Sequence, residues 1–258
     1  MSGVFDAYAG YYDELYRDKD YAGEAAYVSS HIRRHCPKAE SILELGCGTG
    51  AHAEHLARDG FLVHGVDISD RMVSGAKARQ GRLATDIASR LGFEVGDARS
   101  VRTGRKYDVV VSLFHVMSYQ VGNSDLQAVV STAAEHLEPG GLFLFDYWYG
   151  PAVLSEKPSV RVKRYENESM RIIRIGEPDL RASENVVRVN YQVLIEEKKS
   201  GKLHEIHETH PMRYLFLPEV ASMLAGSRLQ AVDACEWMTS NPPSATTWNV
   251  CSVARAPE

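Results

Sequence analysis

The chain has 258 residues, 44% of them hydrophobic and 24% charged, and a formal net charge of −5 at pH 7. A chain of this size and composition can bury a substantial core in one large domain or in a domain with an insertion, which excludes a disordered protein. The acidic balance offers no broad basic surface for a phosphate backbone, so we expect no nucleic-acid partner.

Cysteine usage and the absence of long apolar runs indicate the cellular compartment of the protein. The four cysteines form no C-x-x-C pair, which is usual for a protein in a reducing cytosol. The N-terminus carries no basic segment followed by an apolar core, and no apolar run reaches the roughly 18 residues of a transmembrane helix. We therefore expect a cytoplasmic protein with no membrane association.

The first predicted strand, residues 41–45, leads into a turn that contains Gly46, Gly48 and Gly50. Glycine lacks a Cβ, so these positions let the chain turn sharply and bring its backbone close to a bound molecule. A helix after the turn would offer free N–H groups to that molecule. This order predicts a pocket for an adenosine-containing cofactor.

The second predicted strand, residues 61–66, ends at Asp67. Asp67 follows Gly46 by about 20 residues, which is the offset expected of a carboxylate that binds ribose hydroxyls. A helix over residues 70–80, capped by Ser69 or Asp70, comes next, and residues 85–91 continue or repeat it. A short strand at residues 93–96 then ends at Asp97.

The continuous apolar run at residues 107–113 is typical of a strand that is buried on both faces of a parallel sheet. A helix from about residue 123 to 137 follows, a Pro-Gly-Gly stop closes it, and residues 142–147 form the fifth strand. This alternation predicts an α/β fold with a doubly wound, mostly parallel, seven-stranded sheet, whose ligand lies beyond the carboxyl ends of the strands. The residues predicted at those ends are Gly46, Asp67, Asp97, Leu113 and Asp146.

Beyond Pro151 the hydrophobic pattern changes to alternation of polar and apolar residues, which predicts an antiparallel meander with turns at 177–178 and 198–201. A short helix with proline in its first turn and two final strands should return to the main sheet. We therefore predict a cofactor-binding core with an N-terminal helical lid at 1–150, an inserted substrate cover at 151–217 and a return to the core at 218–258.

Glycine spacing distinguishes two classes of cofactor. Dinucleotide enzymes favour G-x-G-x-x-G, whereas this chain has G-x-G-x-G, and a charged Glu44 just inside the strand would suit a cationic ligand better than a diphosphate. The segment Glu44 to Gly50 resembles the first motif of class I S-adenosylmethionine-dependent methyltransferases. The resemblance implies a Rossmann-like methyltransferase fold, S-adenosyl-L-methionine as cofactor, S-adenosyl-L-homocysteine as product, and an Asp97 that accepts from the adenine amino group.

The residues expected to bind this cofactor come from the N-terminal lid, the glycine turn and the strand ends. They are Tyr16, Tyr21, Glu44, Gly46, Cys47, Gly48, Gly50, Asp67, Ile68, Met72, Asp97, Ala98 and Leu113. Two other functions remain open at this point: an NAD-dependent oxidoreductase, and a protein that binds the cofactor without catalysis.

Aromatic residues gather around the segments that should line a second pocket, and their apolar faces and polar tips suit a small polar ring. The residues expected to bind the substrate are Tyr12, Tyr147, Trp148, Tyr149 and His210. Four residues around this pocket, namely Tyr16, His115, Tyr119 and Asp146, are expected to orient the reactants or handle protons. His115 is the best-placed base for a hydroxyl acceptor, whereas an amine with a free lone pair needs no strong base.

Further motifs, including residues 12–25, 113–119 and 147–149, are similar to those of the sugar N,N-dimethyltransferases that make the amino sugars of macrolide antibiotics. The similarity implies methyl transfer to an amine or hydroxyl of a small molecule, with an amino sugar as the model acceptor, and places Tyr16 and Tyr119 beside the transfer site. Residues 114–116 and 241–246 depart from that family. The departure at 241–246 leaves open whether the acceptor carries a nucleotide diphosphate. A homodimer also stays open.

The segment His204 to His210 is rich in histidine, but it does not supply H-E-x-x-H, and a strand would divide its histidines between two faces. We therefore expect no metal site there.

Overall fold

A computed structural model describes residues 15–258, so the predicted substrate residue Tyr12 lies outside the described residues. The core is a parallel sheet in the order β3-β2-β1-β4-β5, extended by β11, which is antiparallel to β5, and by the edge strand β10. The predicted α/β fold with a doubly wound seven-stranded sheet is therefore confirmed. The core strands are β1 (Ser41–Leu45), β2 (Leu62–Asp67), β3 (Leu91–Val95), β4 (Tyr107–Ser112), β5 (Leu137–Tyr149), β10 (Gln230–Glu236) and β11 (Asn249–Arg255).

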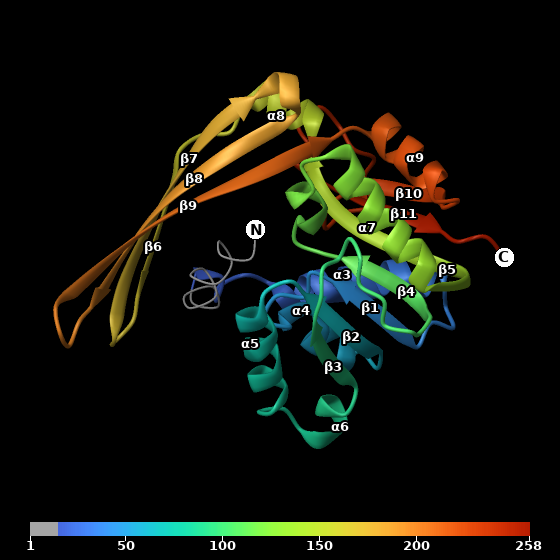
Figure 1. Ribbon diagram of the computed structural model, residues 1–258, viewed down its shortest axis with the longest axis horizontal. Helices are drawn as coiled ribbons and strands as arrows, with labels where there is room; N and C mark the ends of the chain where they lie inside the picture. The colour runs from blue at the N-terminus through green and yellow to red at the C-terminus, as the bar shows by residue number, and fades with distance from the viewer. Residues whose placement is uncertain (1–14) are drawn as a thin grey trace.

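Helices cover both faces of this sheet (Figure 1). One face packs against α3 (Tyr21–His35), α4 (Ala51–Arg58) and α5 (Asp70–Gln80). The other packs against α7 (Asn123–His136) and α9 (Leu217–Gly226). Successive strand residues point to opposite faces, so Leu144 enters the first layer and Phe145 the second. Apolar burial on both faces explains why these strands are almost uniformly hydrophobic.

Three long strands and a shorter one form an antiparallel arm that extends away from the core, as Figure 1 shows. We call this segment the arm; it consists of β6 (Arg161–Glu166), β7 (Met170–Arg181), β8 (Val186–Glu197) and β9 (Lys202–Leu215). The end of β9 pairs in parallel with the end of β5, at Trp148 with Tyr214 and at Tyr149 with Leu215. This pairing makes the arm continuous with the core sheet and places it at the carboxyl ends of the core strands.

The first predicted turn of the meander is wrong. Glu177 and Pro178 lie within β7 and pair with Asn190 and Val189 of β8. Proline is tolerated there because β6 pairs with β7 only as far as Gly176, so Pro178 has no strand on its other side to which it would donate. The chain instead turns at residues 167–169 and at the short 3-10 helix η2 (Ala182–Glu184).

Three short elements complete the fold: α6 (Thr85–Ala88), the 3-10 helix η1 (Val116–Tyr119) after β4, and α8 (Gly150–Glu156) after β5. The sequence did not predict α8. Among residues 15–258, no helix combines the length and the apolar composition that crossing a bilayer requires.

Candidate functional site

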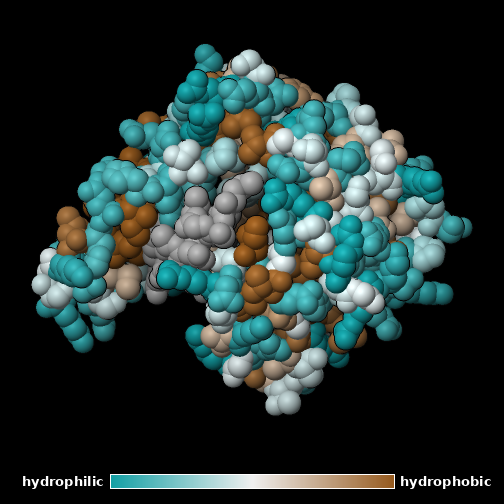
Figure 2. Space-filling view, viewed as in Figure 1, coloured by the Kyte–Doolittle hydropathy of each residue, from teal (hydrophilic) through white to brown (hydrophobic). Residues whose placement is uncertain are grey.

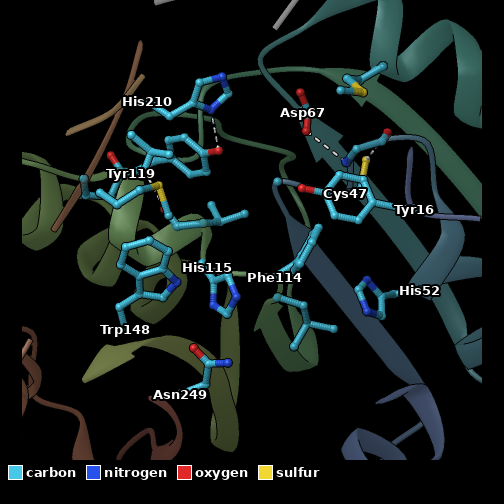
Figure 3. Close-up of a pocket in the computed structure, with 18 of the residues that line it drawn as sticks. Tyr16, Cys47, His52, Asp67, Phe114, His115, Tyr119, Trp148, His210 and Asn249 are labelled. Carbon is cyan, nitrogen blue, oxygen red and sulfur yellow. Dashed lines mark hydrogen bonds between the residues drawn. The ribbon is translucent and has the colours of Figure 1, made fainter. Parts of the chain in front are cut away.

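A cavity of about 470 Å³ lies between the carboxyl ends of the core strands and the inner side of the arm. On the face shown in Figure 2, apolar surface gathers on the inner side of the arm and on the facing part of the core. In the close-up of Figure 3, Tyr119, His210 and Trp148 lie on one side of the cavity, Cys47, Asp67 and His52 on the other, with Phe114 and His115 between them.

Most of the predicted site residues line this cavity. From the expected cofactor set they are Tyr16, Tyr21, Gly46, Cys47, Gly48, Asp67, Ile68, Met72, Asp97, Ala98 and Leu113. From the expected catalytic and substrate sets they are Tyr16, His115, Tyr119, Trp148 and His210. Five predicted residues do not line it, namely Glu44, Gly50, Asp146, Tyr147 and Tyr149.

The glycine turn follows β1 and has positive φ at Gly46, Gly48 and Gly50. A Cβ on Gly46 would meet Val116 Cγ2 at 2.4 Å, and one on Gly50 would meet the Phe93 ring at 2.9 Å, so both glycines are needed for packing. A Cβ on Gly48 would meet no atom within 4 Å, because Gly48 faces the cavity. Gly50 therefore supports the turn from behind rather than touching a ligand, and Gly48 forms the wall of the cavity.

Asp67 at the end of β2 holds this turn in place. Its Oδ2 accepts a hydrogen bond from Gly48 N at 2.9 Å, and its Oδ1 accepts one from Ser69 N at 2.9 Å. Burial raises the pKa of Asp67, while these two N–H groups lower it. Each carboxylate oxygen has a second lone pair, so Asp67 can also accept from hydroxyls of a ligand in the cavity.

Asp97, which follows β3, is ion-paired with a neighbouring arginine. Arg99 Nη2 lies 2.6 Å from Asp97 Oδ2, and Arg99 Nη1 lies 3.2 Å from Asp125 Oδ1. The hydrogen bonds from Arg99 hold the pKa of Asp97 below its ordinary value. Both side chains line the cavity, so a ligand that contacts Asp97 meets an ionised carboxylate whose position Arg99 fixes.

Glu44 differs from the expectation of a charged group facing a cationic ligand. It is 1% exposed, lies within β1, where residues on both faces are buried, and does not line the cavity. Burial, with a contribution from the charge of Asp67, raises the pKa of Glu44 to about 8. At neutral pH the carboxyl is therefore mostly protonated in the folded protein, and the electrostatic argument for Glu44 does not hold.

The charged network at this end of the cavity is centred on His52 of α4. His52 Nε2 lies 2.7 Å from Glu24 Oε2, Lys19 is ion-paired with the other oxygen of Glu24, and His52 Nδ1 lies 3.9 Å from Glu44 Oε1. Burial raises the pKa of Glu24, but the hydrogen bonds and charges of His52 and Lys19 outweigh it and lower the pKa to about 2. The sequence did not single out these residues, because their partners lie on different elements.

Tyr16 connects the two sides of the cavity. Its ring meets the ring of Phe114 edge-on, with centroids 5.1 Å apart, and its hydroxyl accepts a hydrogen bond from Arg174 Nη1 at 3.1 Å. Arg174 comes from β7 in the arm and is only 7% exposed. The N-terminal segment and the arm therefore meet across the cavity through an aromatic ring and a buried guanidinium.

The loop after β4 carries two strained residues, Phe114 and His115, with φ of 61° and 66°. Non-glycine residues seldom adopt positive φ, and two in succession persist only when the surrounding structure holds them. Asp146 supplies that hold: its oxygens accept from His115 N at 3.1 Å, and His115 Nδ1 lies 2.6 Å from Asp146 Oδ2. Asp146 is 1% exposed, so it stands behind His115 and does not reach the cavity.

A chain of buried polar groups starts at Tyr119 in η1 and continues into the arm. Tyr119 Oη lies 2.9 Å from His210 Nδ1, and His210 Nε2 lies 3.2 Å from Glu208 Oε2. Both contacts are satisfied when Nε2 carries the proton, so that Tyr119 donates to Nδ1 and Nε2–H donates to the carboxylate. Burial raises the pKa of Tyr119, which keeps the phenol protonated at neutral pH. No local sequence pattern indicated the link from Glu208 to His210.

The three aromatic residues at the end of β5 do not all face the cavity. Trp148 lines it, whereas Tyr147 is fully buried on the opposite face, where its hydroxyl contacts Ser252 Oγ at 3.1 Å, and Tyr149 packs in the same layer. The expectation for Tyr147 and Tyr149 was therefore wrong. Consecutive strand residues alternate between faces, so only the middle residue of the three can turn toward the site.

The arm gives its side of the cavity a positive charge. Arg161, Lys163 and Arg174 from β6 and β7 line the cavity. Lys163 Nζ lies 4.9 Å from the centre of the Tyr16 ring, and Arg174 Cζ lies 4.7 Å from that of Tyr191, distances at which a cation is attracted to the ring face. These residues mark the region where an anionic part of a ligand fits best.

The histidines of β9 are dispersed. His204 lies 3.1 Å from Glu197 and is partly exposed, His207 lies 3.0 Å from Glu205 and is exposed, whereas His210 is buried against Tyr119. The separation of these side chains along and across the strand agrees with the period-two argument.

Comparison with known proteins identifies the central part of the chain. Residues 42–141 match the family model described as a methyltransferase domain. The chain is 36% identical over 151 residues to dTDP-3-amino-3,4,6-trideoxy-alpha-D-glucopyranose N,N-dimethyltransferase from Streptomyces venezuelae. This alignment covers 58% of this chain and 60% of that protein. The chain is 33% identical over 150 residues to dTDP-3-amino-3,6-dideoxy-alpha-D-glucopyranose N,N-dimethyltransferase from Streptomyces fradiae, which covers 56% of each. These alignments span less than two thirds of the relatives' length.

Solved structures match over nearly the whole chain. An S-adenosylmethionine-dependent methyltransferase from Clostridium acetobutylicum has a TM-score of 0.81 at 19% identity, over 98% of this chain and 99% of that one. The sugar N-methyltransferase KedS8 from Streptoalloteichus has a TM-score of 0.81 at 21% identity, over 100% and 94%. Residues 42–141 therefore match a methyltransferase domain, and the chain has, over nearly its full length, the fold of these solved structures.

Proposed function

We propose that the protein is an S-adenosylmethionine-dependent N-methyltransferase whose acceptor is an amino sugar carried by a nucleotide diphosphate. The observation that carries the proposal is the two-sided cavity, which has the glycine turn and Asp67 on one side and Tyr119, His210 and Trp148 on the other. The curated relatives named above are N,N-dimethyltransferases of dTDP-linked amino sugars, which supports the same acceptor class.

The residues at the glycine turn fit the cofactor. Gly48 leaves open space where any other residue would place a Cβ, and Asp67 offers acceptor oxygens beside it. Asp97, Ala98 and Met72 line the adjoining wall, where an adenine would lie between a carboxylate and apolar side chains. S-adenosylmethionine, when bound, supplies a methyl group on a positively charged sulfur, which a nearby amine can attack.

The arm side of the cavity fits the acceptor. Trp148, Tyr119 and Tyr191 offer ring faces and polar tips to a sugar, and Arg161 and Lys163 would contact its diphosphate. These cations favour a nucleotide-linked acceptor even though residues 241–246 differ from the pattern of the resembling family. Burying both reactants between the core and the arm would align them and exclude water, which supplies most of the rate gain in such a displacement.

The hydrogen-bonded side chains of Tyr119, His210 and Glu208 would together remove a proton from the acceptor. An ammonium group must lose this proton before its nitrogen can attack. The acceptor gives a proton to Tyr119 Oη, and the phenol proton passes to His210 Nδ1. Glu208 then stabilises the imidazolium through its contact with Nε2. In this proposal Tyr119 touches the acceptor, while His210 and Glu208 act through it.

A hydroxyl acceptor is the main alternative, and His115 would be its base. His115 lines the cavity, and its Nδ1 lies 2.6 Å from Asp146 Oδ2, which leaves Nε2 as the atom that would take a proton. We favour the amine for two reasons. The hydrogen-bonded series that begins at Tyr119 faces the same cavity, and the curated relatives modify amines. The glycine spacing and the methyltransferase match also favour methyl transfer over an NAD-dependent oxidoreductase or a non-catalytic binding protein.

Two measurements test the proposal. Calorimetry should give tight binding of S-adenosylhomocysteine and none of NAD. Initial rates should be higher with a dTDP-linked amino sugar than with the same sugar carrying a hydroxyl in place of the amine. Tight NAD binding without S-adenosylhomocysteine binding, or faster transfer to the hydroxyl sugar, would contradict it. The division at residues 150 and 217, a homodimer and the cytoplasmic location stay predictions.

A further inference from the structure

Three donor side chains meet where α3 packs against the edge strand β10, outside the cavity described above. His31 and His35 are one helical turn apart on α3, with their rings stacked at 6.2 Å and 19°, and Asp233 faces them from β10. One donor atom of each residue lies within 4.8 Å of the other two. Two imidazoles separated by four helical positions, with a carboxylate from a second element, make a common ligand set for a divalent transition metal.

One nitrogen of each histidine lacks a hydrogen-bond partner within the described part of the chain. His31 is 6% exposed, and neither its Nδ1 nor His35 Nε2 makes a hydrogen bond, although both atoms are buried. Unpartnered buried nitrogens are rare in proteins, so this pair requires an explanation.

The spacing between His35 and Asp233 is informative. His35 Nε2 lies 3.6 Å from Asp233 Oδ2, which is too long for a hydrogen bond. Two ligand atoms of a tetrahedral zinc ion with bonds of ordinary length are roughly 3.4 Å apart. Arg34 Nη1 also approaches Asp233 Oδ2, at 3.8 Å, but the Arg34 side chain is 66% exposed and can move into solvent.

We propose that His31, His35 and Asp233 form a structural Zn²⁺ site that joins α3 to β10. Imidazole and carboxylate ligands together suit Zn²⁺. Small side-chain rotations would bring His31 into coordination. Cys235 Sγ lies 3.8 Å from His31 Nε2, but it already contacts Tyr27 Oη at 3.0 Å, so we assign the fourth position to water.

The site would stabilise the helix whose first residue, Tyr21, lines the cavity. The first turns of α3 carry Tyr21, which lines the cavity, and Glu24, which pairs with His52. A metal ion that fixes the last turn of α3 to the sheet would therefore oppose its local unfolding. The effect is on stability, and the ion takes no part in the reaction.

The test is metal binding by the full chain, measured on protein stripped with a chelator. We expect one Zn²⁺ per chain by elemental analysis after dialysis, and a rise in Tm of about 5 °C when free Zn²⁺ is 100-fold above its Kd. Co²⁺ bound at the same site should give the intense visible absorption of a tetrahedral complex.

Two variants assign the site. Asp233→Asn keeps the size of a partly exposed side chain, and His35→Gln keeps a polar group, so both should fold while losing the Zn²⁺ stoichiometry and the Tm rise. His204→Ala, which removes a partly exposed histidine that pairs with Glu197, is the matched control and should behave as the unaltered protein. If Zn²⁺ leaves the Tm of the unaltered protein unchanged, the cluster is an ion pair only. If all variants bind equally, the ion sits elsewhere; either result overturns the proposal.

Discussion

Tyr119 and His210 lie 91 positions apart in the sequence, yet the phenol oxygen of the first is 2.9 Å from Nδ1 of the second. The contact joins the loop after β4, which belongs to the core, to β9 of the arm. It therefore connects the part of the fold that would hold the cofactor with the part that would hold the acceptor. Glu208 extends the contact further into the arm.

Tyr119→Phe should lower kcat by about 100-fold at neutral pH, because the acceptor's ammonium then loses its path for proton transfer. The loss should shrink as the pH rises, since the free amine forms in solution without help. Initial rates between neutral and alkaline pH measure both effects. The control is Tyr147→Phe, which removes a buried phenol on the opposite face of β5 and should cost about 1 kcal/mol of stability but no rate. An equal loss at every pH would contradict the proton path.

Glu208→Gln tests whether the carboxylate acts through His210. The amide cannot stabilise an imidazolium as a carboxylate does, so kcat should fall while KM for the acceptor changes little. The pH profile of this variant should move in the same direction as that of Tyr119→Phe. A change in KM alone would show that Glu208 only shapes the cavity.

Gly48→Ala should weaken binding of S-adenosylhomocysteine by about tenfold, or 1.4 kcal/mol, because the new methyl group would occupy the cavity. Part of any effect comes from the positive φ of 53°, which alanine adopts with strain. Gly104→Ala separates the two causes: Gly104 has a φ of 70°, meets no atom within 4 Å and does not line the cavity. Calorimetry that finds equal affinities for the two variants would remove Gly48 from the binding site.

The end of β5 gives a test of the acceptor side. Trp148→Leu should raise KM for the acceptor, since Trp148 lines the cavity, and should leave cofactor affinity nearly unchanged. Tyr149→Leu changes the adjacent residue, which packs into the opposite layer, and should leave KM unchanged. Steady-state kinetics at saturating cofactor measure both. The reverse pattern would mean that the acceptor lies on the other face of the strand.

Glu44 should make the free protein less stable as the pH rises. Its pKa is about 8 when folded and 4.5 in the reference state, so between these values the folded protein holds one proton more than the unfolded chain. Stability is then fully present below pH 4.5 and falls by about 1.4 kcal/mol for each pH unit until the folded pKa is passed. Urea unfolding without cofactor measures this slope, and Glu44→Gln should remove it.

A matched carboxylate controls for the global charge of the protein. Glu138 is exposed, and Glu138→Gln should leave the slope as it is in the unaltered protein. If Glu44→Gln and the unaltered protein lose stability in parallel, the carboxyl of Glu44 is ionised in the folded state and the burial argument is wrong.

Features that depend on neighbouring residues could be predicted from the sequence. Apolar runs and the glycine turn identified the core strands, and Ser69 caps α5 as expected by accepting from Met72 N. The turn, Asp67 and Asp97 were also found in order, because their spacing follows from one strand-helix-strand unit. The family resemblance added the two tyrosines, Tyr16 and Tyr119, which line the cavity.

Features that depend on residues distant in the sequence could not be predicted from it. Pro178 looked like a turn residue because local rules do not reveal that β6 ends before it. Glu44 looked charged because its burial and its distance from Asp67 are tertiary properties. The roles of Arg174 and Glu208 depend on contacts with Tyr16 and His210, which no local pattern encodes. The error at Tyr147 and Tyr149 was avoidable, since alternation along a strand already excludes three neighbours in one pocket.

The central claim is that the cavity between the glycine turn and the arm transfers a methyl group to an amine. The most direct measurement incubates the protein with methyl-labelled S-adenosylmethionine and a dTDP-linked amino sugar, then locates the label by mass spectrometry and NMR. We predict that the label appears on the sugar nitrogen and that S-adenosylhomocysteine forms in equal amount. Label on a hydroxyl oxygen, or an unmodified sugar in the presence of tightly bound cofactor, would contradict the claim.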